Sequence, residues 1–208
     1  MRASGILLPV SSLPSKYGIG AFSKEAYRFV DSLKAAGQKY WQILPLGPTG
    51  YGDSPYQSFS TFAGNPYFID LEELIEKGYI TAKDCEECDF GDDERYIDYG
   101  KMYEARYVIL QKAYEASNIT ENDEFKKYVK KNAFWLVDYS LYMAIKKKFN
   151  SVSWMEWDED IRLRKPEALK EYAEKLQKQV EFYQFLQYEF HIHVDIHRSA
   201  ISNSTIIC

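Results

Sequence analysis

The first part of the chain carries two short apolar runs separated by an amphipathic segment. Residues 5–9 form an apolar run typical of a buried parallel strand, and residues 40–46 form a second one. Between them, apolar residues at helical spacing predict a helix that is capped by Ser23 and ends at Gly37. A strand, a helix and a strand within about 45 residues predict a βαβ unit with parallel strands and a right-handed crossover.

The chain beyond residue 70 is predicted to be largely helical, because apolar residues recur there at helical spacing. An acidic connection, 84–98, interrupts this pattern after the first helix. The predicted helices are 71–77, 103–116, 124–148 and a long helix that begins at Pro166 and extends to about residue 190.

The segment 47–66 is a long loop rich in Gly, Pro, Ser, Thr and Tyr. It follows the second predicted strand directly, and barrels and doubly wound folds place their active sites beyond the C-terminal ends of parallel strands. Long loops in compact domains are usually functional or disordered. Because this one is too aromatic for disorder, we predict that it carries function.

Composition and charge exclude several classes of partner. The chain is 46% hydrophobic and 27% charged, as globular proteins are, and its net charge of −5 argues against nucleic acid. No apolar run approaches membrane-spanning length, and the N-terminus does not resemble a signal peptide, so we expect a cytoplasmic protein without a membrane partner. The aromatic share of 16% suits stacking on sugar rings, although core packing explains most of these residues.

The loop and the strand before it also carry an extended motif. The motif reads WQILPLGPTGYGDSPYQS at 41–58 and continues as FSTFAGNPY at 59–67, with SLP at 12–14, YGIG at 17–20, IDY at 97–99 and WLVDY at 135–139. On these residues the chain closely resembles the amylomaltases, the 4-α-glucanotransferases of glycoside hydrolase family 77. The likeness runs from about residue 5 to about residue 190, which is far more specific than a short pattern.

The resemblance implies an α/β fold, the N-terminal part of a (β/α)8 TIM barrel with a largely helical insertion. Residues 1–70 would supply the first two strands, and 71–190 the insertion. It implies a transferase that passes segments between α-1,4-glucans and maltooligosaccharides, without a cofactor or a metal. The family mechanism is retaining, through a covalent glycosyl-enzyme, and needs two carboxyl groups about 5 Å apart.

The resemblance also implies substrate-binding residues. Tyr56 resembles the family tyrosine that stacks on the sugar next to the cleaved bond. Tyr51 and Tyr103 resemble a pair that forms a second glucan site in some relatives, whereas without the resemblance a helical Tyr103 would be core packing. Asp53 and Ser54 would either bind sugar hydroxyls or cap the backbone of their own loop.

No catalytic residue is predicted. The family nucleophile lies in an Arg-Ile-Asp-His-like segment and its acid/base in a Glu-Asp-Leu-Gly-like segment, and neither occurs here. We therefore expect a truncated transferase that is inactive alone, with barrel strands beyond the second absent. The alternatives are a non-catalytic α-glucan-binding fragment and a helical interaction module built around 101–190.

The last residues, 191–208, differ in composition from the rest. They contain no Phe, Tyr, Trp, Leu, Lys, Gly or Pro, although the chain is rich in several of these, and they hold all three histidines. Such a change indicates either an out-of-frame tail or a natural disordered terminus.

Two patterns resemble metal sites, but neither is predicted to be one. Cys85 and Cys88 have the C-x-x-C spacing, yet no second pair follows and the flanking acids should raise the thiol pKa. In the tail, alternate residues would share one face of a strand. These residues are His191, His193, Asp195 and His197.

Overall fold

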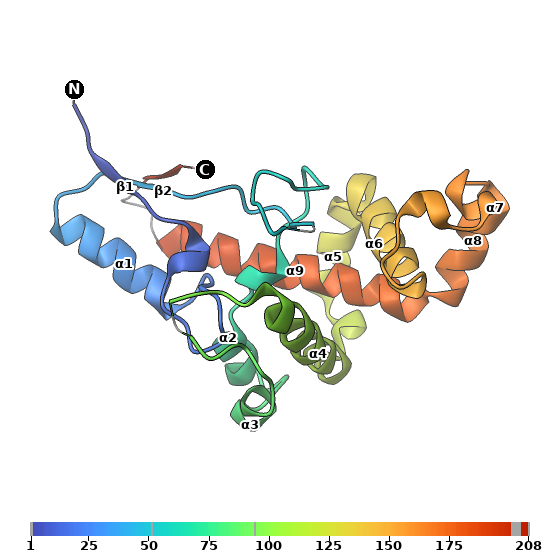
Figure 1. The fold of residues 1–208 in the computed structure, drawn as a ribbon, viewed down its shortest axis with the longest axis horizontal. Helices are drawn as coiled ribbons and strands as arrows, with labels where there is room; N and C mark the ends of the chain where they lie inside the picture. Colours follow the sequence, from blue (N-terminus) through green and yellow to red (C-terminus); the bar gives the residue numbers. More distant parts are fainter. Residues whose placement is uncertain (1, 51, 94, 201–204, 208) are drawn as a thin grey trace. The chain divides into compact units, whose positions relative to one another are not determined.

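The structure is a computed structural model that describes residues 2–50, 52–93, 95–200 and 205–207. The chain divides into two compact units, one formed by Met1–Ser117 with Glu189–Cys208 and the other by Asn118–Tyr188. The first unit holds the sheet and the helices around it (Figure 1). The second unit is built from helices.

The sheet of the first unit consists of three parallel strands in the order β1-β2-β3. These strands are β1 (Gly5–Leu7), β2 (Tyr40–Gln42) and β3 (Thr205–Ile207), with Tyr40 in register with both Gly5 and Thr205. The two predicted parallel strands are confirmed, but they end at Leu7 and Gln42 rather than at residues 9 and 46. The expectation that no third strand is present is wrong, because the β-branched run at 205–207 favours an extended backbone that pairs with β2.

Helix α1 (Lys24–Ala35) connects β1 to β2 as predicted. The Ser23 hydroxyl accepts a hydrogen bond from the Glu25 amide at 3.2 Å, and Gly37 ends the helix with a φ of +70°. The Phe29 ring meets the Trp41 ring edge-on at 5.1 Å, so α1 packs against the central strand.

Strand β1 differs from its prediction, because its side chains are exposed. Ile6 is 43% and Leu7 is 55% exposed, whereas Trp41 on β2 is 2% exposed. β1 lies at the edge of the sheet formed by the described residues, although Tyr40 and Gln42 of the central strand are exposed as well.

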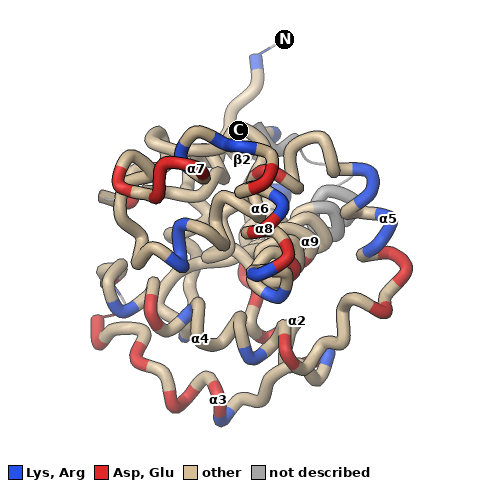
Figure 2. The backbone as a smooth tube through the Cα atoms, turned by 90° about the vertical axis from the view of Figure 1, so that its right-hand side faces the viewer, with Lys and Arg blue, Asp and Glu red and all other residues tan. Residues whose placement is uncertain are grey.

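Three α-helices complete the central part of the first unit. These helices are α2 (Leu71–Glu76), α3 (Ala82–Glu86) and α4 (Tyr99–Ser117). The predicted helix at 71–77 is confirmed, and the one at 103–116 is longer than predicted. Helix α3 was not predicted; it forms inside the acidic connection because Thr81 and Asp84 make a reciprocal capping box. Charged residues of both signs lie along this part of the chain (Figure 2).

The second unit has the predicted helices, but two of them are interrupted. The break between α5 and α6 comes at Asn132, whose amide nitrogen donates to the Tyr128 carbonyl at 2.9 Å. The core of the second unit includes a cluster formed by Leu141, Ile145, Trp157, Ile161 and Ala168. The helices are α5 (Asp123–Lys131), α6 (Ala133–Lys148), α7 (Glu159–Arg162), α8 (Pro166–Lys175) and α9 (Gln177–Ala200), the last of which ends in the first unit.

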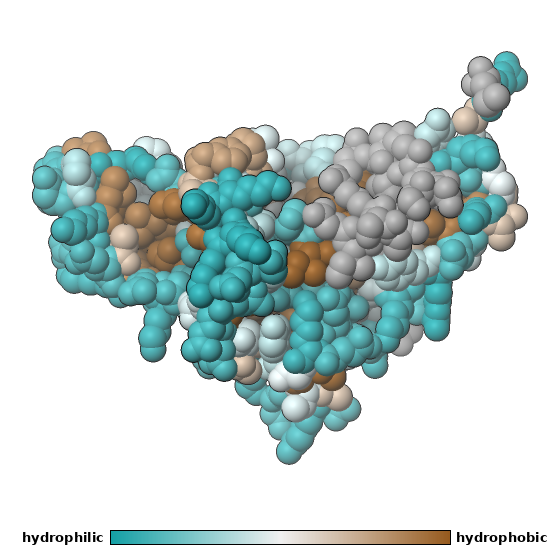
Figure 3. All heavy atoms as spheres, turned by 180° about the vertical axis from the view of Figure 1, so that it is seen from behind, coloured by the Kyte–Doolittle hydropathy of each residue, from teal (hydrophilic) through white to brown (hydrophobic). Residues whose placement is uncertain are grey.

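Short 3-10 helices and exposed apolar residues occur along the chain. The 3-10 helices are η1 (Val10–Ser12), η2 (Pro66–Phe68), η3 (Ile119–Glu121) and η4 (Trp154–Glu156). Figure 3 shows a face on which apolar atoms lie among hydrophilic ones. Every helix in the described part of the chain is too short or too polar to span a bilayer.

The end of α9 is held in the first unit by a buried polar network. Glu189 is 1% exposed, and its carboxylate accepts a hydrogen bond from Lys77 Nζ at 2.7 Å. Lys77 also pairs with Glu73 at 3.0 Å, and His193 Nε2 lies 3.0 Å from Glu73 Oε2. Burial raises the pKa of Glu189, and the Lys77 charge opposes that shift. Because α9 is helical here, His191 and His193, two residues apart, do not share one face, and the side chains of Asp195 and His197 lie outside the described ones.

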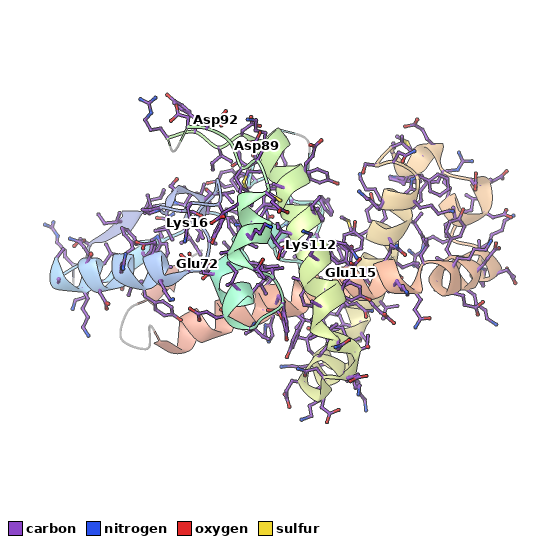
Figure 4. All side chains as sticks on the ribbon, turned by 90° about the horizontal axis from the view of Figure 1, so that it is seen from below. Lys16, Glu72, Asp89, Asp92, Lys112 and Glu115 are labelled. Atoms are coloured by element: carbon purple, nitrogen blue, oxygen red, sulfur yellow. The ribbon has the colours of Figure 1, made fainter. Side chains whose placement is uncertain are left out.

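Ion pairs add further links at the surface of this unit. Lys16, in the loop after β1, lies 2.6 Å from Glu72 of α2 (Figure 4). Lys112 of α4 lies 2.9 Å from Asp84 of α3. Such exposed pairs each contribute little to stability, so the unit depends chiefly on its core and on the buried network.

We expect Gly64→Ala to destabilise the first unit by about 1–3 kcal/mol, because the added Cβ would collide with the ring of Phe190 on α9. Gly50→Ala is the matched control, since a Cβ there meets no atom of the described residues within 4 Å. Urea unfolding of both variants measures the difference. Equal stability of the two variants would contradict this packing.

Candidate functional site

A cavity opens in the first unit beyond the C-terminal ends of β1 and β2. The empty space between its lining residues amounts to about 420 Å³, which includes open solvent at the mouth. The residues after β1, the loop after β2 and the start of α4 all line it, which is the position expected for a ligand site in a parallel α/β fold. Its polar lining residues are Ser11, Thr49, Asp53, Asn65, Tyr67 and Tyr99.

Local hydrogen bonds shape the loop 47–66. An isolated antiparallel bridge joins Thr49 to Ser58, and the Asn65 amide donates to the Leu46 carbonyl at 2.8 Å, so the two ends of the loop are held together. Within it, Asp53 has a φ of +51°, a left-handed conformation that an aspartate tolerates better than most residues. The Thr49 hydroxyl donates to the Asp53 carboxylate at 3.1 Å and so fixes the direction of that side chain.

The predicted substrate-binding residues occupy different environments. Asp53 lines the cavity, and the neighbouring Ser54 is half-buried, its carbonyl accepting from the Gln57 amide at 3.0 Å. Tyr56 is 74% exposed, and Tyr103 of α4 is 43% exposed with its ring 4.8 Å from that of Tyr107. Core packing therefore does not describe Tyr103. Tyr51 lies outside the described residues.

Two tyrosines that the sequence analysis did not select as site residues lie in the cavity wall. The rings of Tyr67 and Tyr99 are 6.4 Å apart. Burial raises the pKa of each phenol, and the negative charge of Asp53 raises it further, so both hydroxyls remain protonated donors near neutral pH. Both tyrosines belong to the quoted motifs, NPY and IDY, and their position in those motifs was the available signal.

A buried arginine lies behind this wall. Arg106 of α4 is 1% exposed, and it donates to the carbonyls of Tyr67 at 2.9 Å and Ile69 at 3.0 Å. Burial lowers its pKa to about 10. Asp70 is 8% exposed and accepts from the Glu72 amide at 3.1 Å as the N-cap of α2; burial raises its pKa to about 6.

Of the two patterns that resembled metal sites, the cysteine pair lies among the described residues, whereas the side chains of Asp195 and His197 lie outside them. Among the described residues, no three His, Cys, Asp or Glu side chains are grouped so that they could hold a metal ion. Cys85 is buried, and burial raises its thiol pKa to about 11, with Cys88 adding to the shift. The predicted direction is confirmed, but burial rather than the flanking acids is the main cause.

The parallel strands and the cavity beyond their C-terminal ends are consistent with the N-terminal part of an α/β barrel fold. The structure of this chain matches that of an amylomaltase from Streptococcus agalactiae in complex with acarbose, with a TM-score of 0.92 and 37% identity over 99% of this chain and 42% of that one. The chain belongs to the 4-alpha-glucanotransferase family, whose family model matches residues 8–207.

Curated relatives agree with this assignment. The chain is 54% identical to the 4-alpha-glucanotransferase of Clostridium butyricum over 87% of its own length and 37% of that protein. It is 44% identical to the enzyme of Thermus thermophilus over 91% of its length and 38% of that protein. The chain thus spans less than half the length of these relatives.

We expect the stability of the protein to depend on pH through Asp70. Its folded-state pKa of about 6 exceeds the ordinary value of 3.8, so the folded state binds the proton more tightly than the unfolded state. The resulting stability is present below about pH 4 and is lost as the pH rises through about 6. Asp70→Asn should remove this loss and stabilise the protein at pH 7 by on the order of 2 kcal/mol.

Denaturant unfolding from pH 4 to pH 7 measures this effect. Asp84→Asn is the control. Hydrogen bonds from Thr81 and Lys112 lower the pKa of Asp84, so loss of this carboxylate should destabilise the protein at pH 7. A wild-type protein whose stability relative to Asp70→Asn stays constant over this range would show that the Asp70 carboxylate is not held as described.

Proposed function

We propose that this chain provides the glucan-binding part of a cytoplasmic 4-α-glucanotransferase, which transfers segments between α-1,4-glucans. The observation that carries the proposal is the cavity beyond β1 and β2, bordered by a loop on which the Tyr56 ring stands 74% exposed. The family membership supports the reaction class. The bound acarbose of the Streptococcus agalactiae amylomaltase supports a glucan-like ligand.

The chemistry of the cavity suits a neutral sugar. Its wall presents the Asp53 carboxylate, the Asn65 side chain and the phenols of Tyr67 and Tyr99, which together offer acceptors and donors to hydroxyl groups. Aromatic faces provide apolar area for the C–H faces of a pyranose ring. A phosphorylated ligand fits less well, because Asp53 would repel it.

In this proposal the predicted residues have separate roles. Tyr56 stacks on the sugar next to the cleaved bond, while Asp53 and Ser54 contact sugar hydroxyls from the same loop. Tyr51 and Tyr103 form the second glucan site. The bond from Thr49 to Asp53 leaves the other carboxylate oxygen of Asp53 available to a ligand, since a carboxylate accepts at two oxygens.

We expect Tyr56→Ala to weaken maltoheptaose binding about tenfold, because stacking on one aromatic ring contributes on the order of 1 kcal/mol. Tyr96→Ala is the matched control, since Tyr96 is equally exposed at 76% but lies outside the loop. Isothermal titration calorimetry compares the two variants with the wild-type protein. Equal loss of affinity in both variants would remove the support for a stacking role of Tyr56.

We also expect these 208 residues, expressed alone, to release no glucose from maltotriose. The reason is chemical: a retaining transfer needs a carboxylate nucleophile and a carboxylic acid about 5 Å apart, and the family segments that carry them do not occur in this sequence. Thin-layer chromatography of products from maltotriose tests this expectation. Formation of glucose and longer oligomers would show that carboxylates within these residues perform the transfer.

A further inference from the structure

Arg106 is a buried cation whose partners are main-chain carbonyls. Its guanidinium is fully desolvated, and its two hydrogen bonds go to Tyr67 and Ile69. The Nε atom has no hydrogen-bond partner among the described residues. Taking a charge out of water is unfavourable. If this position only had to be filled, an apolar side chain would stabilise the fold more than an arginine.

The two carbonyls belong to the segment that forms one wall of the cavity. The carbonyls of Tyr67 and Ile69 point to Arg106, while the Phe68 carbonyl between them accepts from the Phe22 amide at 3.2 Å. Tyr67, Phe68 and Ile69 are all buried. A buried carbonyl needs a hydrogen-bond partner, and these three carbonyls point alternately to Arg106 and to Phe22. The backbone of residues 67–69 is therefore held from two sides.

Arg106 also belongs to α4, whose first residue, Tyr99, lies in the same cavity wall as Tyr67. Tyr99, which lines the cavity, precedes Arg106 by seven residues on α4, which is two helical turns and therefore the same side of the helix. The guanidinium thus ties the tyrosine-bearing side of α4 to the backbone that carries Tyr67.

We propose that Arg106 is a positioning residue of the glucan site: by holding the carbonyls of Tyr67 and Ile69, it sets Tyr99 of α4 against the segment that carries Asn65 and Tyr67. The planar arrangement of the guanidinium donors matters more than the positive charge. A lysine ammonium is a single point donor and cannot hold two carbonyls in the same planar geometry. The inference rests on the proposed function only where a glucan serves as the probe.

Hydrogen–deuterium exchange of Arg106→Lys tests the positioning role without any ligand. We expect exchange in the segment 65–69 to become at least about tenfold faster, while exchange in α1 stays unchanged. Lys77→Met is the matched control, because it removes a different buried ionic contact of the same unit that does not line the cavity. It should accelerate exchange around α2 and the end of α9 instead.

Maltoheptaose affinity, measured well below the unfolding midpoint of each variant, gives the second readout. We expect Arg106→Lys to bind about tenfold more weakly than the wild-type protein, and Lys77→Met to bind like the wild-type protein. Loss of affinity that follows the loss of stability equally in both variants would mean that Arg106 only stabilises the fold, and the proposal would be wrong.

Further outcomes keep the inference separate from the proposed function. If the wild-type protein binds no glucan, the proposed function fails, and the exchange pattern still decides whether Arg106 holds 65–69. If Arg106→Lys does not fold, Arg106→Met fills the space without a charge, and wild-type exchange at 65–69 in that variant would overturn the proposal. Unfolding of both variants would make Arg106 a residue of general stability and would equally overturn it.

Discussion

The parallel pairing of β2 with a strand on each side is the constraint on which the described features of the first unit depend. Hydrogen bonding on both edges fixes the direction and register of β2. Burial of Trp41 fixes which face of the strand packs against α1. The chain after β2 must therefore leave the sheet at the same end as the chain after β1. The cavity lies where these two exits meet.

Polar groups under this cavity are held because they are buried, and a buried polar group needs a partner. The bond from Asn65 to Leu46 holds the two ends of the loop together, and the segment that follows is held by Arg106 and Phe22. The buried network of Lys77, Glu73 and Glu189 does the same for the end of α9, which leads to β3. Hydrogen bonds and ion pairs, as well as apolar packing, thereby position helices α4 and α9.

Membership of the 4-alpha-glucanotransferase family gives this arrangement a functional context. The chain corresponds to less than half of the relatives to which it was compared, and the part that it shares includes the glycine- and tyrosine-rich loop. A site that binds a polymer is well served by exposed rings on a loop anchored at both ends, because the rings then need little further ordering on binding. Tyr56, with a bridge from Thr49 to Ser58 around it, has this character.

The sequence by itself determined the βαβ unit, most helix positions and the family, because periodicity, capping residues and an extended motif are local signals. Ser23, Gly37 and the motif at 41–67 were sufficient for these conclusions. It did not reveal the interruptions at Asn132 and Leu176, since both lie within continuous helical patterns.

Only the tertiary structure decided the exposure of β1, the pairing of β3 with β2 and the roles of Arg106 and Tyr67. Each of these depends on which distant segment lies alongside. Composition set the tail at 191–208 apart, yet His193 is buried against Glu73 because α9 continues past residue 190. A buried arginine looks in sequence like any solvated helix residue, and the carbonyls that it holds lie more than thirty residues earlier in the chain.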